Sequence, residues 1–243
     1  MIVKKSGVND MAFYVVLALG VICTAIFLVK RGADVKIETV VFKALSSVLF
    51  IAVGLFAAAG NPECSRPFSA LIALGGVFGL LGDVWLDLKY AYKKEEKKLL
   101  KTGFTSFLLG HVVYSCSMIY GFNLLWYHYL IALFTGAVIA VVTATTEKLL
   151  KVKYGEFKPI TVVYMTVLGF TVGLSFACML SANFVPFSIM LFVGMVLFIA
   201  SDAVLSGIYF GKGKCVKSQI LLNHILYYGA QYLIASSLVL ANV

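Results

Sequence analysis

The sequence predicts an all-α integral membrane protein, a polytopic bundle of eight transmembrane helices in a single domain covering residues 1–243. Hydrophobic residues make up 61% of the 243 residues and charged residues only 13%, a composition far from that of a soluble domain. The apolar residues also form eight runs, each close to the length of about 20 residues that crosses a bilayer. These runs are 11–29, 39–60, 68–88, 103–121, 125–145, 159–181, 184–206 and 218–239.

The basic residues predict the orientation of this bundle. Sixteen of the 20 Lys and Arg residues lie in four alternate connections, at 30–38, 89–101, 146–158 and 207–217. The positive-inside rule places these connections in the cytoplasm and both termini on the opposite side. The net charge of +9 therefore indicates topology and attraction to anionic membrane lipid, and no nucleic acid partner. The expected membrane is the endoplasmic reticulum in a eukaryote and the inner membrane in a bacterium.

The first two predicted helices each carry basic residues at their cytoplasmic ends. Two lysines precede the first helix, as in a signal peptide, but Lys30 and Arg31 follow it instead of a small-residue cleavage site. We therefore expect this helix in the mature protein. Lys43 enters the second helix from the cytoplasmic side, where its side chain either points into the bundle or extends to the interface.

The third and fourth predicted helices carry ionisable groups within apolar sequence. The stretch GDVWLDLKY ends the third helix with Asp83 and Asp87. Asp87 is one turn nearer the interface, beside Lys89, and is interpreted as a solvated helix-end charge, whereas the deeper Asp83 is expected to be functional. His111, in the fourth helix, is either a site residue or a hydrogen-bonded histidine of the bundle.

The remaining predicted helices place further polar groups at the same depth. The fifth and sixth runs contain no Asp, Glu, Lys or Arg, and the seventh carries Asp202 at its cytoplasmic end. The eighth run carries Tyr227, Tyr228 and Gln231. A charge in hydrocarbon costs several kcal/mol unless it faces a partner or a water-filled cavity. The embedded polar residues therefore predict a pocket that opens to the cytoplasm, with functional roles for Asp83 and Asp202.

The two halves of the chain share a short pattern. GDVWL and HVVY in the first half correspond to SDAVL and HILY in the second, which suggests pseudo-repeats at 11–121 and 125–239. Halves with an even number of helices would be parallel repeats about an axis along the membrane normal. Such an axis would bring Asp83 and Asp202 face to face at one depth.

Two carboxylates in one low-dielectric pocket cannot both ionise easily, so one would hold a proton while the other is charged. This arrangement suits hydrolysis through an oxocarbenium-like state, in which a proton is delivered and a water is activated. It also suits a proton-coupled small-solute transporter or a divalent-metal site. A third class is a lipid-binding or scaffolding membrane protein without catalysis. The sequence lacks a G-x-S-x-G elbow and H-x-x-x-H spacing, which argues against a serine nucleophile and a zinc hydrolase site.

The motifs GDVWL, GHVVYS, SDAVLS and LYYGAQYLIASS, in this order over eight apolar helices, resemble those of the YhhN family, whose animal members are lysoplasmalogenases. The resemblance implies hydrolysis of the sn-1 vinyl ether bond of a lysoplasmalogen to a fatty aldehyde and glycerophosphoethanolamine or glycerophosphocholine. It implies a lysophospholipid substrate drawn from the membrane, with no cofactor and no metal.

The resemblance also implies roles for particular residues. Asp83 and Asp202 match the Gly-Asp and Ser-Asp motifs and would be the catalytic acid and base. The implied substrate-binding residues are Lys43, His111, Tyr114, Tyr227, Tyr228 and Gln231. In the family the lysine often precedes a proline, whereas here Ala44 follows it. Small residues such as Gly75, Gly76 and Gly79 serve either internal packing or a homodimer face.

Overall fold

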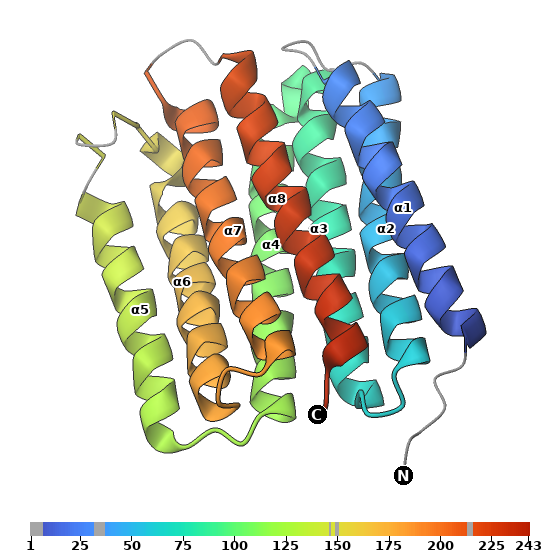
Figure 1. The fold of residues 1–243 in the computed structure, drawn as a ribbon. Coiled ribbons are helices and arrows are strands. Elements are labelled where there is room, and N and C mark those ends of the chain that lie inside the picture. The colour runs from blue at the N-terminus through green and yellow to red at the C-terminus, as the bar shows by residue number, and fades with distance from the viewer. Residues whose placement is uncertain (1–6, 32–36, 146, 149–150, 213–215) are drawn as a thin grey trace.

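The computed structural model describes residues 7–31, 37–145, 147–148, 151–212 and 216–243. These residues form eight long helices that stand side by side (Figure 1). The helices are α1 (Gly7–Lys30), α2 (Ile37–Gly60), α3 (Arg66–Ala91), α4 (Glu96–Gly121), α5 (Trp126–Thr145), α6 (Lys158–Ser181), α7 (Pro186–Phe210) and α8 (Lys217–Ser237). Short 3₁₀ turns occur at Lys93–Glu95, Gly155–Phe157 and Leu238–Leu240. The predicted all-α fold is confirmed for the described residues.

Six of the eight helices are long and apolar enough to cross a membrane, namely α1, α2, α3, α5, α6 and α7. The other two are more polar, because α4 begins in a lysine-rich turn and α8 carries tyrosine, asparagine, histidine and glutamine side chains on its buried face. Three helices have a proline in the first turn, at Pro67, Pro159 and Pro186. Proline is tolerated there because N–H groups of the first turn make no hydrogen bond within the helix.

The helices alternate in direction, so their connections separate to two ends of the bundle. The ends of α1, α3, α5 and α7 and the starts of α2, α4, α6 and α8 lie at the upper end in Figure 1. We call it the basic end, because the four lysine- and arginine-rich segments of the sequence join these helix ends. The start of α1 and the C-terminus lie at the opposite end. Asp83 and Asp202 both lie in the halves of α3 and α7 nearer the basic end.

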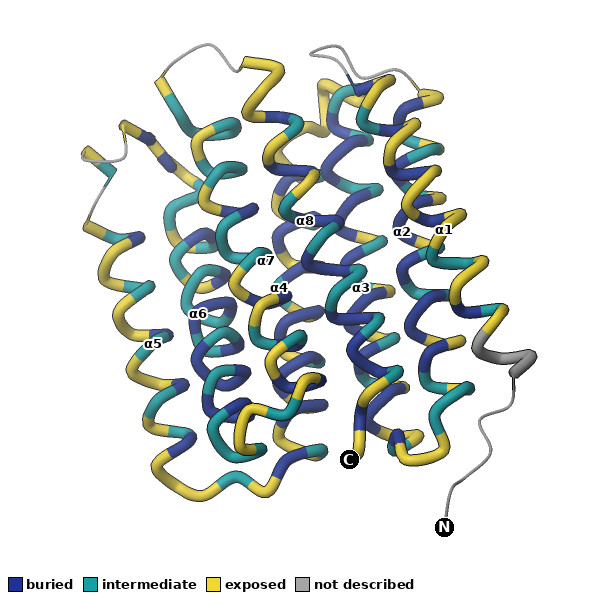
Figure 2. Tube along the Cα trace, viewed as in Figure 1, coloured by how far each residue is buried: buried dark blue, intermediate teal, exposed yellow. Residues whose placement is uncertain are grey.

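The outward faces of the helices are apolar and exposed, as Figure 2 illustrates along α1 and α5. Val29, Trp126 and Phe134 are 81%, 74% and 72% exposed, which is unfavourable in water but suits contact with lipid chains. The buried side chains, by contrast, include many polar groups. The bundle is therefore apolar outside and partly polar inside, the arrangement expected of a membrane protein with an internal site.

Glycines let α5 and α6 pack closely. A Cβ atom added at Gly173 would lie 2.9 Å from the Cα atom of Ala132 and 2.7 Å from Oγ1 of Thr135, and backbone cannot move aside cheaply. We expect Gly173→Val to lower the free energy of unfolding by about 1–3 kcal/mol through overpacking, measured by denaturant titration in detergent. Gly207→Ala is the control, because no atom lies within 4 Å of its added Cβ. Equal stability of the two variants would contradict this packing.

Candidate active site

Asp83 and Asp87 lie one helical turn apart on α3 and are 3% and 0% exposed. The interpretation of Asp87 as a solvated helix-end charge was therefore wrong. Arg31, at the end of α1, donates two hydrogen bonds to the Asp87 carboxylate, with N···O distances of 3.1 and 3.2 Å. The bidentate pairing explains how this carboxylate is accommodated away from solvent.

Lys43 joins both aspartates. Its Nζ atom lies 3.3 Å from Oδ1 of Asp83 and 3.3 Å from Oδ1 of Asp87, and the residue is 3% exposed. The side chain thus points into the bundle instead of extending to the interface. Together with Arg31 it forms a cluster of two cations and two carboxylates, which we call the four-charge cluster and whose formal charge is zero.

The second oxygen of Asp83 is held by hydroxyl groups. Ser47 on α2 donates to Oδ2 at 2.7 Å, and Tyr227 on α8 donates to the same atom at 2.8 Å. With Lys43 on Oδ1, both oxygens of this carboxylate have donors. These donors stabilise the ionised form of Asp83 against the cost of burying its charge.

The predicted residues of α8 are linked to the same cluster. Tyr114 donates to Oε1 of Gln231 at 2.9 Å, and Nε2 of Gln231 approaches the hydroxyl of Tyr227 at 3.4 Å. Tyr228 donates to the carbonyl oxygen of Lys43 at 3.0 Å. A Cβ atom at Gly79 would lie 2.8 Å from Nε2 of Gln231. This glycine therefore packs internally and lets α8 approach α3.

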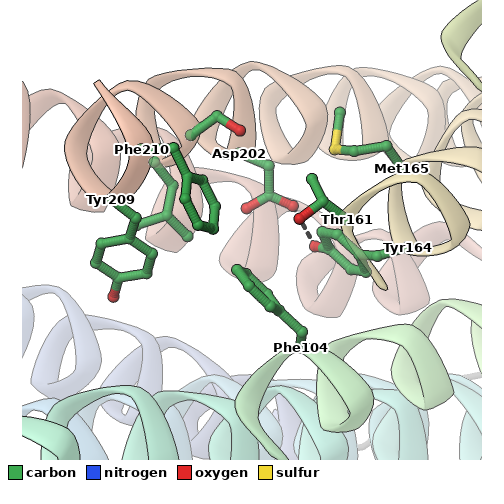
Figure 3. A pocket seen from close by; sticks show the side chains of 9 residues that line it. Phe104, Thr161, Tyr164, Met165, Asp202, Tyr209 and Phe210 are labelled. Carbon is green, nitrogen blue, oxygen red and sulfur yellow. Dashed lines mark hydrogen bonds between the residues drawn. The ribbon is translucent and has the colours of Figure 1, made fainter. Parts of the chain in front are cut away.

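Asp202 on α7 has a different environment (Figure 3). Tyr164 on α6 donates a hydrogen bond to its Oδ2 atom, and within the described part of the chain no cation contacts it. The surrounding pocket is lined by Phe104, Thr161, Tyr164, Met165, Asp202, Leu205, Ser206, Tyr209 and Phe210. Its volume of about 10 Å³ is room for a single water. The Oγ1 atom of Thr161 is buried there without a partner among the described residues, so such a water would have a polar group to bind.

Asp83 does not line this pocket, which differs from the predicted single pocket shared by the two aspartates. Lys43, Ser47 and Tyr227 hold Asp83 toward α2 and α8 instead. A chain of packed rings runs from one aspartate to the other, with centroid distances of 5.4 Å for Tyr227–Phe198, 4.5 Å for Phe198–His111 and 6.0 Å for His111–Tyr164.

His111 belongs to this chain of rings and is 1% exposed. Both of its ring nitrogens lack a hydrogen-bond partner among the described residues. Buried polar atoms in folded proteins nearly always have a partner. The unpaired imidazole is therefore a candidate to bind a ligand or a water, and the alternative of a hydrogen-bonded histidine of the bundle does not describe it.

Sequence reasoning did not identify Arg31, Ser47, Thr161 or Tyr164 as site residues. Arg31 was counted only as a marker of topology, because it follows an apolar run. Tyr164 could have been identified from the sequence, because it places a hydroxyl group within an apolar run that has no charged residue. Nothing in the local sequence distinguishes Ser47 or Thr161 from other small polar residues of membrane helices. Across the described part of the chain, no three His, Cys, Asp or Glu residues come together as a metal-binding group.

The fold and this site define a class: a helical membrane protein with a buried charge cluster beside a carboxyl group in an apolar pocket. A family model matches most of the chain. It matches residues 38–238, from the start of α2 to the end of α8, and the chain belongs to the YhhN family. Neither the curated proteins nor the solved structures compared with it gave a match. Arg31 and all of α1 lie outside the matched segment.

Proposed function

We propose that the protein is a membrane-embedded lysoplasmalogenase, an ether hydrolase that cleaves the sn-1 vinyl ether bond of lysoplasmalogens. The products are a fatty aldehyde and glycerophosphoethanolamine or glycerophosphocholine. Membership of the YhhN family supports this proposal. The observation that carries it is the contrast between the two buried aspartates.

Asp83 and Asp202 differ in the charges and hydrogen-bond donors that surround them. Asp83 touches the ammonium group of Lys43 and accepts two hydroxyl hydrogen bonds, all of which stabilise a carboxylate. Asp202 lies among aromatic and aliphatic side chains with Tyr164 as its donor. A carboxyl group without a cation in such a pocket favours the neutral acid. We therefore assign Asp202 as the proton donor and Asp83 as the ionised partner.

The reaction begins when Asp202 protonates the β-carbon of the vinyl ether, which converts the ether into an oxocarbenium ion. The negative charge of Asp83 stabilises this cation across the layer of rings, in a region where charges interact strongly. A water adds to the cationic carbon and gives up a proton to the carboxylate of Asp202. The resulting hemiacetal then collapses to the aldehyde and the glycerol hydroxyl. Water is the only co-reactant, and the acid is regenerated.

The other residues of the site position these groups or line the path of the substrate. Tyr164 holds Asp202, and Tyr227, with Gln231 behind it, holds Asp83. Lys43 neutralises Asp83 and Asp87, and Tyr228 anchors the backbone of Lys43. We propose that His111 contacts the substrate or the attacking water, since its nitrogens are free among the described residues. The alkenyl chain would enter the Asp202 pocket as its aromatic walls separate.

The same proposal includes all eight helices as membrane spans, with the basic end in the cytoplasm. The neighbours of the helices support two parallel repeats: α2 contacts α3 and α8, and correspondingly α6 contacts α7 and α4. The predicted homodimer stays a prediction.

The direct test incubates the purified protein in detergent with a lysoplasmalogen in D₂O and measures the aldehyde. We expect aldehyde carrying one solvent deuterium at carbon 2, because the β-carbon is protonated during cleavage. The matched control is the saturated 1-alkyl analogue, which offers no carbon to protonate and should give no product. Absence of aldehyde across head groups and pH would contradict the proposal and favour proton-coupled transport, measured as proton flux in liposomes.

A further inference from the structure

A second pocket opens at the basic end, above the Asp202 pocket. Its volume is about 300 Å³, at the lower end of the range for small-molecule sites. Its lining is mostly polar or aromatic and comprises Arg31, Lys89, Tyr90, Glu96, Leu205, Ile208, Tyr209, Ile220, Asn223 and His224. Leu205 and Tyr209 line both pockets, so the two are neighbours along α7. We call this second pocket the basic-end pocket.

Lys89 is the unusual residue of the basic-end pocket. It is 5% exposed, and in the described part of the chain it has no hydrogen bond and no carboxylate within ion-pair distance. Its ammonium group instead lies 3.4 Å from the ring centroid of Tyr209 and 5.1 Å from that of Tyr90. The charges of Arg31 and Lys43 are already balanced by two aspartates. Lys89 thus presents a positive charge at the pocket without an ion-pair partner among the described residues, so an anionic ligand there would have a cation to bind.

A negative group of the protein lies on the same pocket without closing on Lys89. Glu96, in the first turn of α4, is exposed and lines the pocket. It lines the same pocket as Lys89, and among the described residues the two form no ion pair. The basic-end pocket therefore offers a buried cation on one side and an exposed carboxylate on the other, the reverse of the charges in a zwitterionic phosphodiester.

The depth of the two pockets fits a lipid entering head group outward. Seven residues of α7 separate Asp202 from Tyr209, a rise of about 10 Å. A glycerol backbone with its phosphodiester can bridge such a length. A head group in the basic-end pocket would lie at the membrane interface, and the vinyl ether would lie deeper, beside Asp202.

We propose that the basic-end pocket is the head-group site, in which Lys89 binds the phosphate and Glu96 attracts the ammonium group of choline or ethanolamine. This inference rests on the proposed function for the identity of the lipid. It differs from the sequence-based expectation that Lys43 holds the head group, because Lys43 is engaged by Asp83 and Asp87.

The test measures binding of ether lipids that cannot be hydrolysed, so that it does not depend on turnover. Three probes are compared by calorimetric titration in detergent: 1-alkyl-lysophosphocholine, 1-alkyl-lysophosphatidic acid and 1-alkylglycerol. We expect Lys89→Gln to weaken binding of both phosphate lipids by about 10- to 100-fold, the loss of a charge-assisted hydrogen bond. Binding of 1-alkylglycerol should stay unchanged. Glu96→Gln should weaken only the phosphocholine lipid, by about two- to fivefold.

The control variant is Lys98→Gln, which removes an exposed lysine at the same end of the bundle and should leave all three affinities unchanged. The proposal is overturned if Lys89→Gln binds the phosphate lipids as tightly as the unmutated protein does. It is also overturned if the variant's affinity for 1-alkylglycerol falls as much as its affinity for the phosphate lipids. Binding and cleavage are measured separately. If the hydrolase proposal alone is wrong, no aldehyde forms, but Lys89→Gln still weakens binding of the phosphate lipids.

Discussion

Asp202→Asn is expected to lower aldehyde release by about 100- to 10,000-fold, the usual contribution of a general acid. The amide keeps the shape of the side chain and can still accept the hydrogen bond from Tyr164, but it cannot deliver a proton to carbon. The measurement is kcat for a lysoplasmalogen in detergent, together with the thermal unfolding temperature. We expect a large fall in kcat with little change in stability.

Glu63→Gln is the matched control for this carboxyl-to-amide change, because Glu63 is exposed at the opposite end of the bundle. It should retain full activity. The assignment of the acid would be reversed if Asp202→Asn kept most of its turnover while Asp83→Asn abolished it. Loss of activity accompanied by unfolding would instead indicate that Asp202 has a structural role. We do not expect this outcome, because the amide of asparagine can still accept the hydrogen bond from Tyr164.

Lys43→Met is expected to have the largest effect on stability, lowering the free energy of unfolding by about 3–5 kcal/mol. Methionine fills the space of the lysine stem but leaves Asp83 without a cation, because Arg31 pairs with Asp87. One carboxylate is then buried without a cation, inside a bundle where water cannot compensate. Denaturant titration in detergent measures the loss.

The double variant Lys43→Met with Asp83→Asn separates charge balance from packing. It removes one cation and one carboxylate and leaves the Arg31–Asp87 pair intact, so we expect it to be more stable than Lys43→Met alone. A double variant no more stable than the single one would mean that Lys43 acts through packing. Lys30→Gln provides the exposed comparison, because Lys30 and Glu38 are 44% and 68% exposed and such pairs contribute at most about 1 kcal/mol.

The four-charge cluster also explains why α1, which lies outside the family match, matters to the site. Arg31 directly follows α1 and makes a bidentate contact with Asp87, while Lys43 enters from α2. A charge cluster in the interior of a membrane bundle is tolerated when every charge has a partner. The end of α1 is therefore part of the electrostatic support of Asp83.

The sequence by itself determined the class of the protein, because hydrophobic runs of bilayer length and alternating basic connections are local signals. It also located Asp83, Asp202, His111 and the Tyr-Tyr-x-x-Gln element, since polar groups stand out against apolar sequence. Only the tertiary structure decided their partners. The donor that each carboxylate oxygen accepts from depends on how the helices are rotated about their axes and on close helix contacts such as that at Gly79. The periodicity of apolar residues in the sequence predicts neither of these. For this reason Asp87, which the sequence alone suggests is a helix-end charge, is fully buried and paired with Arg31 and Lys43. For the same reason Lys89 has no carboxylate partner in the described part of the basic-end pocket.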